Sequence, residues 1–153
     1  MINEGSMRNP VEIPDKEGKA LSVDQFLDRL ADVAGPLYHL ATVSEQDFLR
    51  SDHTASIKGL LEKVQALLTT PNSVELRKGL APYDEDTFFD RWAALRNSFH
   101  VVHSELEQNA AAGVYALEKR TGIVPHSGKE VAEDVGNLAQ AIIQLQVFLN
   151  SFK

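Results

Sequence analysis

Apolar residues recur at alternating spacings of four and three along two long segments in the C-terminal half of the chain. This pattern is typical of helices that bury one seam. The first segment runs from Asp86 to Thr121, and the second runs from about Lys129 to the end of the sequence. Their seams are Phe88, Trp92, Leu95, Phe99, Val102 and Leu106 in the first, and Val131, Val135, Leu138, Ile142, Leu145, Leu149 and Phe152 in the second. Because a loop of roughly seven residues joins the two helices, they are predicted to form a long antiparallel hairpin.

The seam of the first long helix loses its register after Leu106. The next apolar residues along this helix are Ala110, Val114 and Leu117. This shift adds one residue to the repeat and is expected to relax the supercoil locally. A continuous helix from 86 to 121 would be about 54 Å long, whereas a compact chain of this size is only about 40 Å across. Three arrangements therefore stay open: an elongated bundle, a helix that breaks near Gly113, or a helix end that packs against another chain.

Two shorter amphipathic segments in the N-terminal half predict two further helices. The first begins at Ser22, which forms a capping box with Gln25. Pro36, which follows a glycine, is expected to kink or break this helix, because proline lacks the amide that the helical hydrogen bond needs. The second begins near Ser51 and carries one apolar stripe, made of Ile57, Leu60, Leu61, Val64, Leu67 and Leu68.

No stretch shows the alternation of a strand bounded by turn residues, so the chain is predicted to be all-α. We expect an antiparallel helical bundle of four main helices, with one or two short helices after Ser44 and Ser73. Residues 1–20 lack periodicity and predict a flexible N-terminal tail, whose first six residues are either derived from cloning or a natural extension. The remaining residues, 21–153, are expected to form a single helical-bundle domain.

The composition excludes several classes of protein. None of the 153 residues is a cysteine, which rules out a disulfide scaffold, a thiol nucleophile and cysteine-ligated metals. No run of apolar residues is long enough to cross a bilayer. The net charge of −7 is spread along the chain without a basic segment, which disfavours nucleic acids and anionic membrane surfaces as partners. We therefore expect a soluble, cytoplasmic protein that binds neither nucleic acid nor a membrane.

One group of polar residues on the first long helix is a candidate for chemistry. Arg96, His100, His103 and Glu107 recur at helical spacing and therefore share one stripe beside the apolar seam. Our main interpretation is a solvated flank, in which the histidine rings cover the edge of the core. An alternative is a metal site, because His100, His103 and Glu107 offer two imidazoles and a carboxylate to zinc or another divalent ion.

A second alternative for the same stripe is ribonuclease chemistry. Arg96-Asn97 followed by His103 resembles the signature of the HEPN ribonucleases, which are small all-α domains that dimerise to form the active site. The resemblance covers this one motif. It implies that Arg96 stabilises a phosphate, that Asn97 supports it and that His103 transfers a proton. The motif has low specificity, because roughly 0.7 matches are expected by chance in a chain of this composition.

The function that we expect is not enzymatic. The sequence contains no glycine-rich phosphate loop, nucleophile elbow or zinc-protease helix, and no cofactor is expected. The long seams and the apolar C-terminus favour a small interaction or regulatory protein that acts through helix-face contacts with itself or with another protein. We favour a homodimer, while an elongated monomer stays open. The residues expected at the interface are Phe148, Leu149, Phe152, Ala110, Gly113 and Val114.

Overall fold

The computed structural model of the chain describes residues 21–69, 79–81, 83–115 and 124–151. Within these ranges the chain is all-helical and contains no strand, which confirms the all-α prediction. None of the described helices is long and apolar enough to cross a lipid bilayer. The elements in chain order are α1 (Val23–Ala41), the 3-10 helix η1 (Glu45–Leu49), α2 (Ser51–Thr69), α4 (Glu85–Ala111) and α5 (Gly128–Asn150). Outside the described residues lie the predicted tail 1–20, most of the short helix after Ser73, and Leu117, Thr121 and Phe152.

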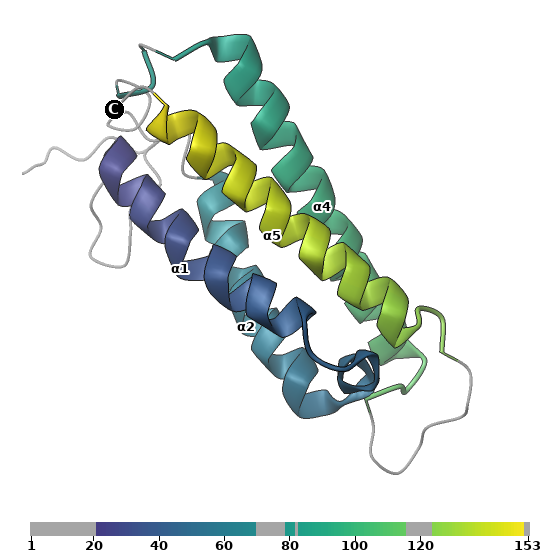
Figure 1. Cartoon of the computed structure of the whole chain (residues 1–153). Coiled ribbons are helices and arrows are strands. Elements are labelled where there is room, and N and C mark those ends of the chain that lie inside the picture. Colours follow the sequence, from purple (N-terminus) through teal and green to yellow (C-terminus); the bar gives the residue numbers. More distant parts are fainter. Residues whose placement is uncertain (1–20, 70–78, 82, 116–123, 152–153) are drawn as a thin grey trace, which may run out of the picture.

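Helix α5 lies between α1 and α4 and packs against both of them (Figure 1). Helix α2 packs against α1 and α4, and η1 packs against α5 and α2. The buried side chains of all five elements form one hydrophobic core. Tyr83 ties the chain just before α4 to the end of α5, because its hydroxyl donates a hydrogen bond of 2.6 Å to the carbonyl of Leu149.

Polar side chains cap the starts of three helices. Ser22 and Gln25 form the predicted capping box of α1, with hydrogen bonds of 2.9 and 3.2 Å between side chain and backbone. Asp84 caps α4 and Ser127 caps α5, since each side chain accepts a hydrogen bond from the backbone amide three residues further along the chain. The cap at Ser127 fixes where the chain enters α5, and the candidate site depends on this point.

Helix α1 is one continuous helix with Pro36 inside it, so the predicted break at this proline is absent. Pro36 lies on the exposed face of the helix, where water can bond the carbonyl that its missing amide leaves free. On the opposite face Val33 and Leu37 are fully buried in the core. Burial of this face stabilises the helix on both sides of the proline.

The predicted seams are buried: among the described seam positions of α4 and α5, Trp92 is the most exposed, at 9%. The register slip predicted after Leu106 is wrong. Helix α4 keeps its spacing, so that Asn109 occupies the next seam position and is fully buried. Ala110, which was expected there, is exposed. A polar residue therefore takes a place in the core, and its contacts belong to the candidate site.

Helix α4 ends at Ala111, two residues after the buried Asn109, and does not continue to Thr121. Gly113 has a φ of 78°, which glycine adopts without the strain that a Cβ atom brings. The chain turns there, and the amide of the buried Val114 donates to the carbonyl of Asn109 at 3.0 Å. With 27 residues, α4 is about 40 Å long. This length fits a compact chain, so it gives no reason to expect packing against another chain.

Candidate functional site

The polar stripe predicted on α4 faces solvent. Its members, Arg96, His100, His103 and Glu107, are all exposed, and none of their side chains forms a hydrogen bond or ion pair with another described residue. The rings of His100 and His103 pack against Phe99, with centroids 5.3 and 5.7 Å from that of the phenyl ring. The stripe therefore has the geometry expected of a solvated flank whose histidines cover the edge of the core.

Neither alternative interpretation of this stripe finds its groups assembled in the described part of the chain. The ligand atoms of His100, His103 and Glu107 do not come together within 4.8 Å. Asn97, like its neighbour Arg96, is exposed, and its side chain makes no hydrogen bond with another described residue. The ribonuclease resemblance therefore rests on its sequence motif alone.

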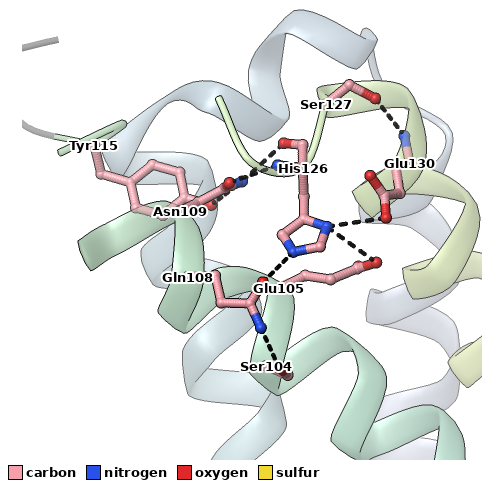
Figure 2. Close-up of polar contacts among 8 residues, drawn as sticks. All are labelled: Ser104, Glu105, Gln108, Asn109, Tyr115, His126, Ser127 and Glu130. Atoms are coloured by element: carbon pink, nitrogen blue, oxygen red, sulfur yellow. Dashed lines mark hydrogen bonds and ion pairs between the residues drawn. The ribbon is translucent and has the colours of Figure 1, made fainter. Parts of the chain in front are cut away.

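A different group of side chains brings metal-ligand atoms together, at the end of α4 (Figure 2). Glu105 belongs to the C-terminal part of α4, His126 to the loop that enters α5, and Glu130 to the first turn of α5. One ligand atom of each residue lies within 4.8 Å of the other two. The Nδ1 atom of His126 is 2.9 Å from Oε2 of Glu130 and 3.8 Å from Oε2 of Glu105. We call these three residues the acid–histidine cluster.

Asn109 fixes the backbone of His126 beside α4. Its side-chain oxygen accepts a hydrogen bond of 2.9 Å from the backbone amide of His126. Its side-chain nitrogen donates one of 2.9 Å to the carbonyl of the same residue. The same nitrogen also donates to the hydroxyl of Tyr115 at 3.3 Å. Both ends of the buried amide group are thus hydrogen-bonded, which explains why a polar side chain is stable at a seam position.

Gln108 and Ser104 fix the ring of His126. The Oε1 atom of Gln108 lies 2.5 Å from Nε2 of the ring, and the Nε2 atom of Gln108 donates to the hydroxyl of Ser104 at 3.0 Å. A carbonyl oxygen only accepts hydrogen bonds, so Nε2 of the ring carries a proton. Nδ1 is then the ring atom that faces the carboxylates of Glu105 and Glu130, as Figure 2 shows.

Glu105 is buried although its side chain is acidic. The side chain is only 7% exposed, and its Oε1 atom has no hydrogen-bond partner among the described residues. Burial, together with hydrogen bonds of the protonated side chain to Asp134 and Glu130 and the negative charge of these two groups, raises the pKa of Glu105 to about 9. The pKa of the exposed Glu130 is lowered, in the first place by its hydrogen bond with His126. Without a bound cation, Glu105 therefore keeps its proton at neutral pH.

Sequence reasoning missed the acid–histidine cluster. The signal that it overlooked is Asn109, which follows Leu106 by three residues and so continues the seam with a polar residue. Glu105 lies one helical turn before Asn109 and shares its face of the helix. His126 and Glu130 carry no comparable signal, because an acidic residue in the first turn of a helix is already explained by the helix dipole.

Of the residues expected at a protein interface, two are buried within the folded chain and three keep some exposure. Leu149 and Val114 are buried within the chain itself and offer no side chain to a partner. The apolar C-terminal part of α5 thus receives much of its cover from the chain's own core. The expected interface residues that keep some exposure are Phe148, Ala110 and Gly113.

The outward face of α5 carries no charge along most of its length. Its exposed side chains include Asn137, Gln140, Gln144 and Val147, which follow one another at helical spacing. We call these four residues the α5 outer face. Val147 is 60% exposed, the largest value among the exposed large hydrophobic residues of the described chain. No charged residue occurs between Asp134 and Lys153.

No protein-family model matches the chain, and no curated protein or solved structure matches it significantly. Two features of the described chain are therefore interpreted from their own chemistry. They are the α5 outer face and the acid–histidine cluster.

Proposed function

We propose that this chain is a small, non-enzymatic interaction or regulatory protein that acts through a helix face and associates with a second copy of itself. The proposal is carried by the α5 outer face, whose side chains are exposed but uncharged. The exposed faces of other helices carry charges, such as Asp28 and Asp32 on α1 and Lys58 and Glu62 on α2. Depletion of charged residues is the compositional mark of the centre of a protein interface.

A second copy of the chain suits this face. Asparagine and glutamine side chains both donate and accept hydrogen bonds, so a stripe of them can pair with itself across a twofold axis. Val147 adds an exposed apolar group that gains from burial. With a net charge of −7, two copies repel each other over most of their surface. Contact at the α5 outer face avoids bringing carboxylates of the two copies together.

We also propose that the four helices form an antiparallel bundle in which α4 and α5 are a long C-terminal hairpin. Two contacts support this arrangement. Tyr83, just before α4, bonds the end of α5 at Leu149, and Asn109, near the end of α4, bonds His126 just before α5. Such a hairpin is a stiff support for a helix face that has to meet its partner in one geometry.

The oligomeric state of the full chain tests the proposal. Sedimentation velocity over a range of protein concentrations should show a monomer that converts to a dimer. Val147→Glu places a charge on the α5 outer face and should abolish the dimer, because the charge would be desolvated in the contact. Val101→Glu is the matched control, since Val101 is 45% exposed on α4 and lies outside this face. A chain that stays monomeric at high concentration, or a dimer that Val147→Glu leaves intact, contradicts the proposal.

A further inference from the structure

We infer that Glu105, His126 and Glu130 bind one divalent transition-metal ion, and that zinc is the ion that fits them best. This site is independent of the α5 outer face. It joins the end of α4 to the start of α5, two segments that the chain brings together from opposite sides of a loop (Figure 2). The inference rests on four observations, which concern the ring of His126, the burial of Glu105, the support of the ligands and the spacing of their atoms.

The first observation is that three atoms with lone pairs face one another. Gln108 holds the proton of His126 on Nε2, so in the neutral ring Nδ1 carries a lone pair. In this neutral state the lone pair faces the Oε2 atoms of Glu105 and Glu130, whereas a second proton on the ring turns the contact with Glu130 into a hydrogen bond. Acceptor atoms at such distances repel one another unless a cation lies between them. The cation is either a proton or a metal ion, and the remaining observations favour a site built for the metal.

The second observation is the orphaned oxygen of Glu105. Its side chain is more than nine-tenths buried, and Oε1 finds no hydrogen-bond partner in the described part of the chain. A buried polar atom without a partner costs on the order of 1–3 kcal/mol. A carboxylate that binds a metal ion through either oxygen is relieved of this cost. A ligand role gives this buried carboxyl group a metal ion in place of the proton that it otherwise shares with Asp134 and Glu130, whereas packing alone favours an apolar residue at this place.

The third observation is that two of the three ligands, His126 and Glu130, are already held in place. Asn109 fixes the backbone of His126 through two hydrogen bonds, and Ser127 caps the turn that carries Glu130. The Oε1 atom of Gln108 accepts a hydrogen bond from the ring nitrogen that faces away from the carboxylates. Metal-bound histidines in proteins are usually held in this way, with the other ring nitrogen donating to a carbonyl or carboxylate.

The fourth observation is the spacing of the ligand atoms. In a tetrahedral zinc site with bonds of about 2.1 Å, neighbouring ligand atoms lie about 3.4 Å apart. The distances from Nδ1 of His126 to the two carboxylate oxygens, 2.9 and 3.8 Å, lie on either side of this value. Calcium prefers about six to eight oxygen ligands, and an imidazole with two carboxylates does not supply them.

The three protein ligands leave a fourth position of a tetrahedral ion open. The side chain of Glu130 is 47% exposed, so water reaches the cluster from this side. An open position of this kind is filled by water or by a donor atom of another molecule. Asp134 stands one helical turn after Glu130 and adds negative charge close to Glu105, which strengthens the attraction for a cation.

Zinc titration of the full chain, freed of metal by a chelator, tests the inference. Isothermal titration calorimetry at neutral pH should show one zinc ion per chain, and zinc should raise the melting temperature, because a ligand that binds only the folded state stabilises it. Glu105→Gln keeps the shape of the protonated side chain but cannot ionise to a carboxylate that binds the metal ion. It should therefore abolish both signals. Gln108→Ala should weaken zinc binding by about 10–100-fold, as expected when the group that orients a ligand is lost.

The variant His100→Ala/His103→Ala is the matched control. It removes two exposed histidines from the same helix and should leave the zinc affinity unchanged. Circular dichroism of each metal-free variant shows whether it folds, and cobalt(II) absorption in the visible region reports directly on a nitrogen–oxygen site of low coordination number. Absence of both heat and a melting shift in the intact chain overturns the inference. So does zinc binding that survives Glu105→Gln and disappears in the double histidine variant.

Discussion

The side-chain amide of Asn109 pairs with the backbone of His126, 17 residues further along the chain, through two hydrogen bonds of 2.9 Å. The side chain thus forms with the backbone the same pair of hydrogen bonds that two opposite residues of neighbouring antiparallel strands form with each other. It joins the end of α4 to the entry of α5 and fixes the position of the imidazole ring. Asn109 is therefore the residue on which both the local fold and the acid–histidine cluster depend.

Asn109→Ala should lower the free energy of unfolding by about 2 kcal/mol, because the amide and the carbonyl of His126 both lose their partner. Urea unfolding followed by circular dichroism measures this loss. Asn97→Ala is the matched control: Asn97 is exposed on the same helix, and its loss should change stability by less than about 0.5 kcal/mol. Equal effects of the two substitutions would show that the Asn109 pairing contributes nothing to stability.

The heptad spacing predicted most of α4 and α5 correctly, because burial of a seam depends only on local periodicity. It went wrong after Leu106, where a polar residue was assumed to lie outside the core. Asn109 is buried since its hydrogen-bond partner comes from a residue 17 positions away, and the spacing of apolar residues contains no information about that partner. A break near Gly113 was one of the three arrangements left open, and it is the one that the structure shows, because α4 ends at Ala111 and the chain turns at Gly113.

The candidate site was less predictable than the fold. Exposed histidines at helical spacing, such as His100 and His103, form a visible pattern within one helix, yet they pack on Phe99 and face water. The ligands of the acid–histidine cluster come from two helices and the loop between them, so only the folded chain brings them together. A single sequence marks such a site only by polar residues in the core, and Glu105 and Asn109 are those residues here.

Gly128→Ala should destabilise the chain by about 1–3 kcal/mol, the usual cost of forcing an atom into a packed site. A Cβ atom at this position would lie 1.9 Å from the carbonyl oxygen of Glu45, which belongs to the backbone of η1 and cannot rotate away. Gly59→Ala provides the opposite case. A Cβ atom there meets nothing within 4 Å, and alanine should stabilise α2 by about 0.5–1 kcal/mol. Melting temperatures of the two variants should therefore move in opposite directions from that of the original chain.

Tyr83→Phe should cost about 0.5–1.5 kcal/mol of stability, because it removes the 2.6 Å hydrogen bond to the carbonyl of Leu149 and keeps the aromatic ring. Hydrogen exchange of the amides in the last turn of α5 should speed up, since this bond connects that turn to the start of α4. Tyr38→Phe removes a hydroxyl from a side chain that is more than half exposed and should have no measurable effect. Unchanged exchange at the end of α5 in Tyr83→Phe would contradict the prediction.

The metal-free chain should lose stability as the pH rises, and Glu105→Gln should remove this dependence. The pKa of Glu105 is about 9 in the folded chain and 4.5 for the free side chain. Between these values the folded state holds one proton more than the unfolded state. The free energy of unfolding therefore falls with rising pH, by up to about 1.4 kcal/mol per pH unit. Glutamine cannot ionise, so the stability gained by the variant over the original chain should grow steadily between about pH 5.5 and 9.

Two other groups with shifted pKa values, Glu130 and His53, leave this comparison interpretable. The pKa of Glu130 is lowered, so its contribution is lost only as the pH falls below the usual range of a glutamate, outside the window that is measured. Burial lowers the pKa of His53, but this group is present in both proteins and its effect cancels in the difference. Urea unfolding of both proteins in the presence of a chelator gives the two curves. Parallel curves across the window would mean that Glu105 is already ionised in the folded chain.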